Sequence, residues 1–207
     1  MEEARREALD IGKLLTIILL DAKSAFDVVV HKNLLKKLYH LGIQDKHWTL
    51  IKSLHTNASS AIKFNGLVSE NFNILQGVRQ GDILSADLYK IYIDPLLKQL
   101  QQSRLGMNIG YIECGATACA DDITLNCTDP TEAQIMLNMA YNYSCIEQYK
   151  LQPQKSVVIQ MESRKKSRLN PIELKMIYTI LSNVETATHL GIKRSKTDKK
   201  NHYEYCR

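Results

Sequence analysis

Residues 117–126 read TACADDITLN, and they place two adjacent carboxylates, Asp121 and Asp122, between two short runs of β-compatible residues. This pattern predicts a tight β-hairpin with an acidic tip. Adjacent aspartates repel each other, so a bound cation that neutralises them is the first hypothesis. Oxygen-only ligands on a rigid turn suit Mg²⁺, which keeps several waters and completes its shell with substrate phosphate. An Asp-Asp pair alone is more often a polar turn, and a second acidic element is needed to favour the metal.

Such an element lies far upstream in the sequence. The apolar run at residues 14–20 predicts a strand buried on both faces, and Asp21 follows it directly. If this strand neighbours the hairpin, Asp21 converges with Asp121 and Asp122 on a site for two Mg²⁺ ions, with Mn²⁺ as an alternative. Two metals roughly 3.5 to 4 Å apart activate an attacking hydroxyl and stabilise a leaving oxygen, which is the chemistry of phosphoryl transfer at a phosphodiester.

The rest of the chain predicts helices and hairpins in mixed order. The dipeptide Asn65-Gly66 predicts a two-residue hairpin turn, and residues 156–161 predict a strand. One helix is expected after Val30 and is closed by Gly42. Three further helices are expected at residues 46–54, 85–101 and 131–149. The predicted inward residues of these helices are Leu34, Leu35, Leu38, Leu41, Trp48, Ile51, Leu54, Leu84, Leu88, Ile91, Tyr92, Leu96, Ile135, Met139, Tyr143 and Ile146. Strands and helices in this order favour an α+β domain with a largely antiparallel sheet.

Composition limits the class of partner and the compartment. At 207 residues and 44% hydrophobic, the chain can bury a core, and its net charge of +5 favours an anionic partner. Basic runs at residues 164–168 and 193–200 are typical of a solvated tail or a docking surface, and are exposed in either case. Five cysteines without C-x-x-C spacing indicate reduced thiols in an intracellular reducing compartment. The run at residues 14–20 is too short to span a bilayer, so no membrane partner is expected.

Successive stretches of the chain also carry a family resemblance. These stretches are DAKSAFD at 21–27, QGVRQGDILS at 76–85, ADD at 120–122, LQPQKS at 151–156 and HLGI at 189–192. In order and spacing the series resembles the palm motifs of a reverse transcriptase of the non-LTR (LINE-like) retrotransposon type. The resemblance implies a polymerase palm with its antiparallel sheet packed against helices and with fingers and thumb incomplete. Residues 1–192 would be the palm with partial fingers, and residues 193–207 a basic tail leading to a missing thumb.

The resemblance also implies a function. It is that of an RNA-directed DNA polymerase, which adds dNTPs to the 3′ end of a DNA primer on an RNA template by a two-metal mechanism. The chain would be a fragment of a retrotransposon polyprotein, working with the rest of that polyprotein in ribonucleoprotein particles of the nucleus and cytoplasm.

Site roles follow from the resemblance position by position. Asp21 and Asp121 would be direct metal ligands, with Asp122 a weaker one. Phe26 falls where the family has an aromatic gate against a 2′-hydroxyl, and Lys155 where a lysine acts on pyrophosphate. The other expected contacts are those of Gln80 and Gly81 with the incoming nucleotide and template, and a primer grip at His189, Leu190 and Gly191. Without the family, Phe26 is equally well a core residue and Lys155 a surface lysine.

Several positions depart from the family pattern. Cys119 stands where an aromatic residue is usual, and Ala86-Asp87 replaces a usual Pro-Leu. Asp87 on a helix face that the family keeps apolar costs burial energy unless it reaches water or a partner. A catalytically inactive, decayed remnant that only binds nucleic acid is therefore an alternative. A second alternative is an RNA-dependent RNA polymerase palm, against which Ala120 and Phe26 argue.

Overall fold

The computed structural model describes residues 2–161 and 171–196, and their contacts divide the chain into two compact units. Unit 1 consists of Met1–Lys23, Leu96–Ile146 and Lys150–Arg207, and unit 2 of Ser24–Pro95 and Glu147–Tyr149. The predicted basic run at residues 164–168 and most of the predicted tail lie outside the described residues. Within the described residues, no helix is long and apolar enough to cross a membrane.

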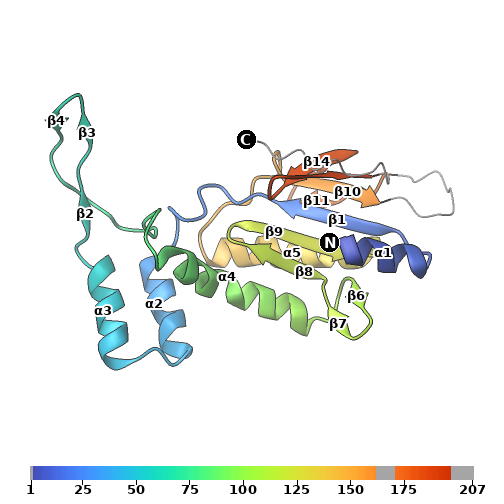
Figure 1. Cartoon of the computed structure of the whole chain (residues 1–207), viewed down its shortest axis with the longest axis horizontal. Helices are drawn as coiled ribbons and strands as arrows, with labels where there is room; N and C mark the ends of the chain where they lie inside the picture. Colours follow the sequence, from blue (N-terminus) through green and yellow to red (C-terminus); the bar gives the residue numbers. More distant parts are fainter. Residues whose placement is uncertain (1, 162–170, 197–207) are drawn as a thin grey trace. The chain divides into compact units, whose positions relative to one another are not determined.

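Unit 1 is built on a sheet of five strands in the order β13-β10-β1-β9-β8 (Figure 1). The strands are β1 (Leu15–Leu20), β8 (Ala116–Cys119), β9 (Asp122–Cys127), β10 (Val157–Met161) and β13 (Ser182–Asn183). All neighbours pair antiparallel except β10 and β13, which pair parallel. Every residue of β1 is buried, as its continuous apolar run predicts for a central strand. The expected largely antiparallel sheet is present.

The two faces of this sheet are covered by different elements. Helix α5 (Pro130–Ile146) packs against β9 and β1. The other face holds the alternate residues Leu15, Ile17 and Leu19 of β1, which cluster with Ala4 and Ala8 of helix α1 (Glu2–Asp10). Because side chains alternate along a strand, this face also takes the side chains of β9 that lie opposite the odd-numbered residues of β1.

The phase of α5 differs in part from the prediction, although Tyr143 is buried as predicted. Ile135 and Ile146 are 43% and 71% exposed, whereas Ala133, Met136 and Ala140 are buried. The backbone N–H groups of Thr131 and Glu132 donate to the carboxylate of Asp129, which caps the helix. The helix ends at Ile146, three residues before the predicted end at residue 149.

Short antiparallel hairpins complete unit 1. They are β6 (Asn108–Ile109) with β7 (Ile112–Glu113), β11 (Lys175–Met176) with β12 (Thr179–Ile180), and β14 (Thr186–His189) with β15 (Ile192–Ser195). The β14-β15 turn consists of Leu190 at φ +52° and Gly191 at φ +71°. Two central residues with positive φ form the turn that matches the twist of a hairpin.

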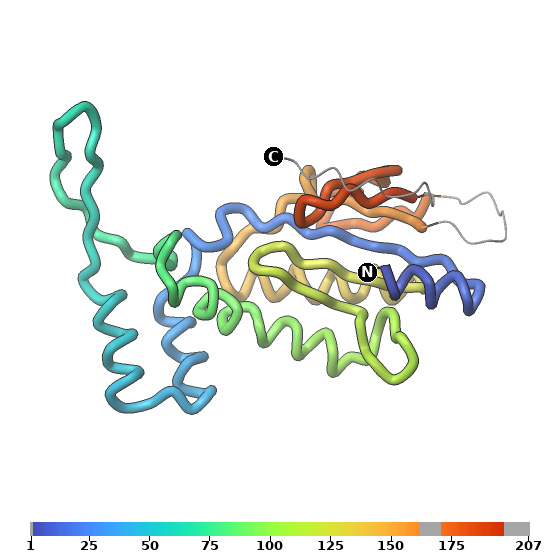
Figure 2. The backbone as a smooth tube through the Cα atoms, viewed as in Figure 1, coloured from blue at the N-terminus to red at the C-terminus, as the bar shows by residue number. Residues whose placement is uncertain are grey.

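Unit 2 contains the helices α2 (His31–His40) and α3 (Asp45–His55) and the first part of α4 (Ser85–Gln102). A two-stranded ribbon leads away from α3, as the tube in Figure 2 shows. It pairs β2 (Ser59–Ser60) with β5 (Phe72–Asn73) and β3 (Lys63–Phe64) with β4 (Leu67–Val68). Asn65 and Gly66 form its turn at φ +46° and +80°, as predicted.

Three predictions of inward-facing residues in unit 2 are wrong. Leu41 follows the end of α2 at His40 and is 49% exposed. Helix α3 has no fully buried residue, and Leu54 is 46% exposed, because α3 packs mainly on α2. Leu84 is 42% exposed because it precedes the first turn of α4. Leu88 and Tyr92 are buried as predicted.

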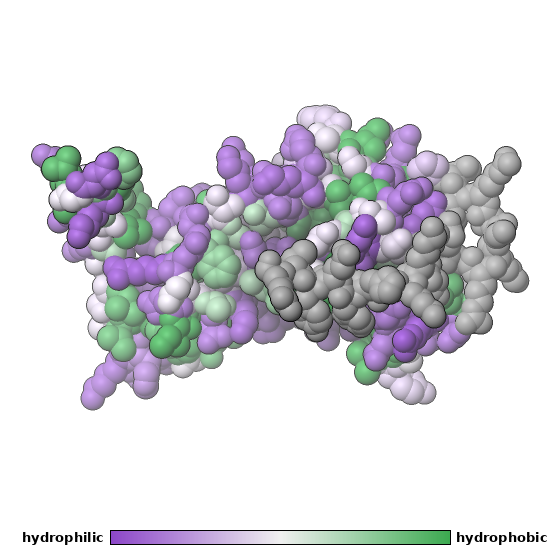
Figure 3. Space-filling model, turned by 45° about the horizontal axis from the view of Figure 1, so that its top comes forward, coloured by the Kyte–Doolittle hydropathy of each residue, from purple (hydrophilic) through white to green (hydrophobic). Residues whose placement is uncertain are grey.

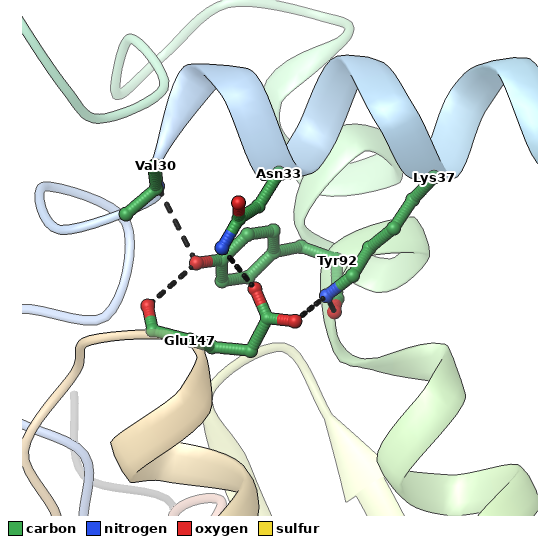
Figure 4. A network of polar contacts seen from close by, with 5 residues as sticks. All are labelled: Val30, Asn33, Lys37, Tyr92 and Glu147. Atoms are coloured by element: carbon green, nitrogen blue, oxygen red, sulfur yellow. Dashed lines mark hydrogen bonds and ion pairs between the residues drawn. The ribbon is translucent and has the colours of Figure 1, made fainter.

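A buried polar network holds unit 2 together (Figure 4). The Lys37 ammonium lies 2.6 Å from a carboxylate oxygen of Glu147 and also donates to the carbonyl oxygen of Tyr92 at 2.8 Å. Asn33 donates to the other carboxylate oxygen of Glu147 at 3.1 Å. The Tyr92 hydroxyl donates to the Glu147 carbonyl at 2.8 Å and accepts from the N–H of Val30, where α2 begins. Helices α2 and α4 and the segment at Glu147 are thereby fixed to one another.

Candidate active site

The register of unit 1 brings two predicted metal ligands side by side. The last pair between β1 and β9 is Leu20 with Ile123, so the next residues along each chain are Asp21 and Asp122. Residues directly opposite in an antiparallel ladder lie about 4.5 to 5.5 Å apart at Cα. The preceding pair, Leu20 and Ile123, points to the face that α5 covers. Because side chains alternate along a strand, Asp21 and Asp122 both point to the opposite face of the sheet. The predicted neighbourhood of the β1 strand and the acidic hairpin is confirmed.

Asp121 occupies the tip of the acidic hairpin. Cys119 pairs with Asp122, which leaves Ala120 and Asp121 as a two-residue turn. Ala120 adopts φ +53°, a left-handed conformation that costs an L-residue about 1 kcal/mol. Asp21, Asp121 and Asp122 are each partly exposed to solvent.

Asp21 is fastened to the segment at residues 151–156. Its N–H donates to the Ser156 hydroxyl at 3.1 Å, and its carbonyl accepts from the Gln152 N–H at 2.8 Å. The side-chain amide of Gln152 donates to a carboxylate oxygen of Asp21 at 2.5 Å. Gln152 and Ser156 are site residues that the sequence reasoning missed, although both lie in the stretch that carries the family resemblance.

The same segment carries the predicted pyrophosphate lysine. Lys155 is exposed, and its N–H donates to the Gln152 carbonyl in the turn that precedes β10. Its backbone is therefore tied through Gln152 to Asp21, and its ammonium is open to solvent.

The side chains do not close into a metal cluster. Across residues 2–161 and 171–196, no three His, Cys, Asp or Glu side chains gather closely enough to hold a metal ion. The three carboxylates repel one another when no cation lies between them. The Asp21 carboxylate accepts a hydrogen bond from the side-chain amide of Gln152. The carboxylate set nevertheless has the all-oxygen chemistry that Mg²⁺ prefers. The metal site stays a prediction.

The predicted primer grip packs on the same sheet face as Asp122. The ring Nε2 of His189 lies 3.2 Å from the hydroxyl of Thr124, which is two residues from Asp122 and therefore shares its face. Burial lowers the pKa of His189, while the negative charge of Asp122 partly opposes that shift. His189 Nδ1 is buried and has no hydrogen-bond partner among the described residues. Leu190 and Gly191 are exposed at the hairpin turn beside it.

In unit 2, the predicted gate residue Phe26 is held from two sides. Its ring stacks on that of Tyr89 with centroids 4.7 Å apart, and its carbonyl accepts from the Val78 N–H at 2.8 Å. Phe26 is half-buried, so part of its side chain is accessible. Sequence reasoning did not single out Tyr89, which helical spacing marks only as a core position of α4.

The loop at residues 76–81 is joined closely to the segment after Phe26. A Cβ at Gly77 would lie 2.8 Å from the carbonyl oxygen of Asp27, and Gly77 has φ +92°. Glycine is therefore required there both by the close backbone approach and by the positive φ. The Gln80 amide donates to the Asp27 carboxylate at 3.1 Å, and Gly81, at φ +86°, is exposed with open space around its Cα.

One departure from the family pattern carries no burial cost. Asp87 is 67% exposed and pairs with Lys90 at 3.0 Å, one helical turn away. Its carboxylate reaches both water and a partner, so the free-energy cost of burying a charge on this helix face does not arise. Cys119 is exposed at the end of β8.

Sequence relatives of the chain are retrotransposon proteins. The retrovirus-related Pol polyprotein of the type-2 retrotransposable element R2DM of Drosophila melanogaster is 26% identical over 80% of this chain and 16% of the relative. A Pol polyprotein of the type-1 element R2 of Popillia japonica is 33% identical over 55% of this chain and 19% of the relative. The chain therefore spans less than 20% of the length of either relative.

Solved telomerase structures share the fold. Telomerase from Candida albicans, in complex with the TWJ fragment of telomeric RNA, matches with a TM-score of 0.62 at 14% identity, covering 95% of this chain and 32% of that one. Apo telomerase from Candida tropicalis matches with a TM-score of 0.59 at 15% identity, covering 93% and 36%. The predicted α+β, reverse-transcriptase-like palm is confirmed.

The family model described as reverse transcriptase (RNA-dependent DNA polymerase) matches residues 2–194. That match includes every predicted site residue and both described stretches of the chain almost entirely. The protein thus belongs to the reverse transcriptase (RNA-dependent DNA polymerase) family, and its relatives are Pol polyproteins of non-LTR retrotransposons, as its motifs predict.

Proposed function

We propose that this chain supplies the palm of an RNA-directed DNA polymerase that works as part of a retrotransposon polyprotein. It would add deoxynucleotides to the 3′ end of a DNA primer on an RNA template. The observation that carries the proposal is the β1-β9 register, which continues from Leu20 and Ile123 to Asp21 and Asp122 beside the tip that holds Asp121. Carboxylates carried on neighbouring strand ends can be drawn together by bound metal ions, which assist phosphoryl transfer.

The metal ligands in this proposal are Asp21 and Asp121, with Asp122 a weaker one. When bound, two Mg²⁺ or Mn²⁺ ions would lower the pKa of the primer hydroxyl and stabilise the leaving oxygen of pyrophosphate. The chain's own residues orient the ligands. Gln152 and Ser156 fix the backbone and one carboxylate oxygen of Asp21. Lys155, exposed on the same segment, neutralises or protonates the departing pyrophosphate.

The remaining predicted residues take substrate roles in this proposal. Phe26, stacked on Tyr89, excludes a 2′-hydroxyl from the incoming nucleotide. Gln80 and the open backbone at Gly81 contact the nucleotide and the template strand. The hairpin turn after His189 supports the primer end.

Metal binding tests the site without requiring turnover. Mn²⁺ added to the protein should broaden the NMR amide signals of residues 20–22 and 120–123 first, because a bound paramagnetic ion relaxes its nearest nuclei most. Asp121→Asn with Asp122→Asn should abolish that selectivity. Glu70→Gln, which removes an exposed carboxylate elsewhere, should leave it unchanged. If the same amide signals broaden equally in the Asp121→Asn, Asp122→Asn variant, the proposed metal site is wrong.

Primer extension on an RNA template tests the reaction itself. Deoxynucleotide addition by the polyprotein that contains this chain should need Mg²⁺ or Mn²⁺ and fall at least about a hundredfold in the double variant, the usual scale for losing charge stabilisation. Persistent extension in that variant would overturn the two-metal mechanism. Binding of nucleic acid without any extension by the unaltered protein would instead support the decayed remnant, which the unusual Cys119 favours. The family match favours a DNA polymerase over an RNA-dependent RNA polymerase.

A further inference from the structure

A groove runs along the helical hairpin of α2 and α3 in unit 2. It has a volume of about 730 Å³ and is lined by Lys32, Leu35, Lys36 and Tyr39 of α2, and by Asp45, Trp48 and Thr49 of α3. The four α2 residues have the i, i+3, i+4, i+7 spacing of a single helix face. This face is distinct from the one that carries Leu34 and Leu38 into the core of unit 2.

The helical hairpin is strongly basic. Residues 31–55 contain five lysines, of which Lys37 is largely buried in its ion pair with Glu147, no arginine and one acidic residue, Asp45, which lines the groove. Lys32 and Lys36, at the groove, are exposed, and lie about 5 to 6 Å apart at Cβ as i, i+4 neighbours on a helix. A basic surface of this density attracts a polyanion and releases its counterions on binding. Figure 3 shows hydrophilic and apolar residues intermixed over the part that holds α2 and α3.

Two aromatic side chains lie between these charges. Tyr39 is 53% exposed, and its ring meets that of His40 edge to face with centroids 6.3 Å apart, so part of the ring is accessible to solvent. Trp48 is half-buried, and its indole N–H donates to the Leu35 carbonyl at 2.9 Å, which fixes the ring orientation across the two helices. The Lys52 ammonium lies 5.0 Å from the centre of the Trp48 ring. The groove therefore combines pre-oriented aromatic surface with cationic side chains.

We propose that this groove binds a single strand of RNA, whose phosphates contact Lys32 and Lys36 and one of whose bases stacks on Tyr39. Basic grooves that carry accessible aromatic rings bind single strands with little sequence preference, because every base has a face that stacks. An apolar protein partner fits less well, since the groove is flanked by lysines that such a partner would have to desolvate. The groove residues belong to unit 2 and the predicted metal ligands to unit 1, so RNA binding by the groove can be measured without the proposed polymerase reaction.

The test is fluorescence anisotropy of a labelled oligouridylate of about 15 nucleotides, titrated with protein between about 50 and 200 mM salt. Lys32→Gln with Lys36→Gln should lower the slope of log K against log[salt] by about 1.4, because each single-strand phosphate contact contributes about 0.7. Tyr39→Ala should weaken binding at least about fivefold through lost stacking. The matched pair Lys63→Gln, Lys90→Gln makes the same change of charge on exposed positions of unit 2 and should leave the slope nearly unchanged.

Further measurements separate the possible outcomes. Circular dichroism and urea unfolding show whether each variant keeps the fold, and photo-crosslinking of a 4-thiouridine RNA should label peptides within residues 31–55. Asp121→Asn with Asp122→Asn should not alter RNA binding by the groove. The proposal for the groove and the proposal for the active site can therefore be refuted independently. An unchanged salt slope in folded Lys32→Gln, Lys36→Gln protein, or crosslinks confined to other segments, would overturn the proposal. So would self-association that Tyr39→Ala abolishes while RNA binding persists, because it would assign the groove to a second copy.

Discussion

Replacing Lys37 by methionine tests how unit 2 is held together. The ammonium of Lys37 is 2.6 Å from Glu147, and the two side chains are only 15% and 8% exposed. Burial lowers the pKa of Lys37, which shows that desolvation outweighs the attraction of Glu147. Methionine keeps the aliphatic stem but removes the cation beside the buried Glu147 carboxylate, which keeps its hydrogen bond from Asn33. Breaking a buried ion pair in this way costs about 3 to 5 kcal/mol.

The sole tryptophan of the chain, Trp48, lies in unit 2 and reports on its unfolding by fluorescence. Urea titration should show a midpoint shift that corresponds to about 3 to 5 kcal/mol for Lys37→Met. Adding Glu147→Gln removes the stranded charge and should recover stability to within about 2 kcal/mol of the parent, because replacing a whole buried pair is often near neutral. A loss below about 1 kcal/mol for Lys37→Met, or a double variant no more stable than the single one, would refute the reasoning.

Further predictions concern the neighbouring segments of unit 2. Gly77→Ala should destabilise unit 2 by about 2 to 4 kcal/mol in the same urea assay, because its Cβ would meet the Asp27 carbonyl at 2.8 Å in a left-handed conformation. Burial lowers the pKa of His31, so the unfolded chain binds the proton more tightly and stability should fall as pH drops from 7 to 5. His31→Gln should flatten that dependence, and an equally steep loss in the variant would assign it to other groups. In a protein that polymerises, Phe26→Val should raise ribonucleotide incorporation relative to deoxyribonucleotide, and unchanged selectivity would make Phe26 a core residue.

The acidic hairpin and its neighbouring strand were predictable because both signals are local. The apolar run before Asp21 has the length and continuity of a central strand, and the Asp121-Asp122 pair sits between β-compatible runs. No local pattern predicts the hydrogen bonds that Asp21 makes with Gln152 and Ser156, because these residues lie more than 130 residues further along the chain. Such contacts arise only when the sheet brings β1 and β10 together.

Helix phase was less predictable, for a physical reason. Helix α5 has apolar residues on every side, so periodicity does not distinguish Ile135 from Met136 as the inward residue. Packing against the sheet decides it, and small Ala133 and Ala140 allow close approach there. In α3 the spacing of Trp48, Ile51 and Leu54 indicates an apolar face correctly, but α2 alone is too small a neighbour to bury it.

The position of Glu147 in the sequence has a consequence for biosynthesis. Residues 147–149 belong to unit 2, although the chain on either side of them, up to Ile146 and from Lys150, belongs to unit 1. During synthesis, Lys37 therefore emerges from the ribosome about a hundred residues before its partner, which takes roughly 5 to 20 s at usual elongation rates. Unit 2 cannot complete its polar network in that interval. A fragment cut at Pro95 would keep Lys37 in the same unfinished state permanently, so any attempt to express unit 2 by itself must supply Glu147 on a grafted segment.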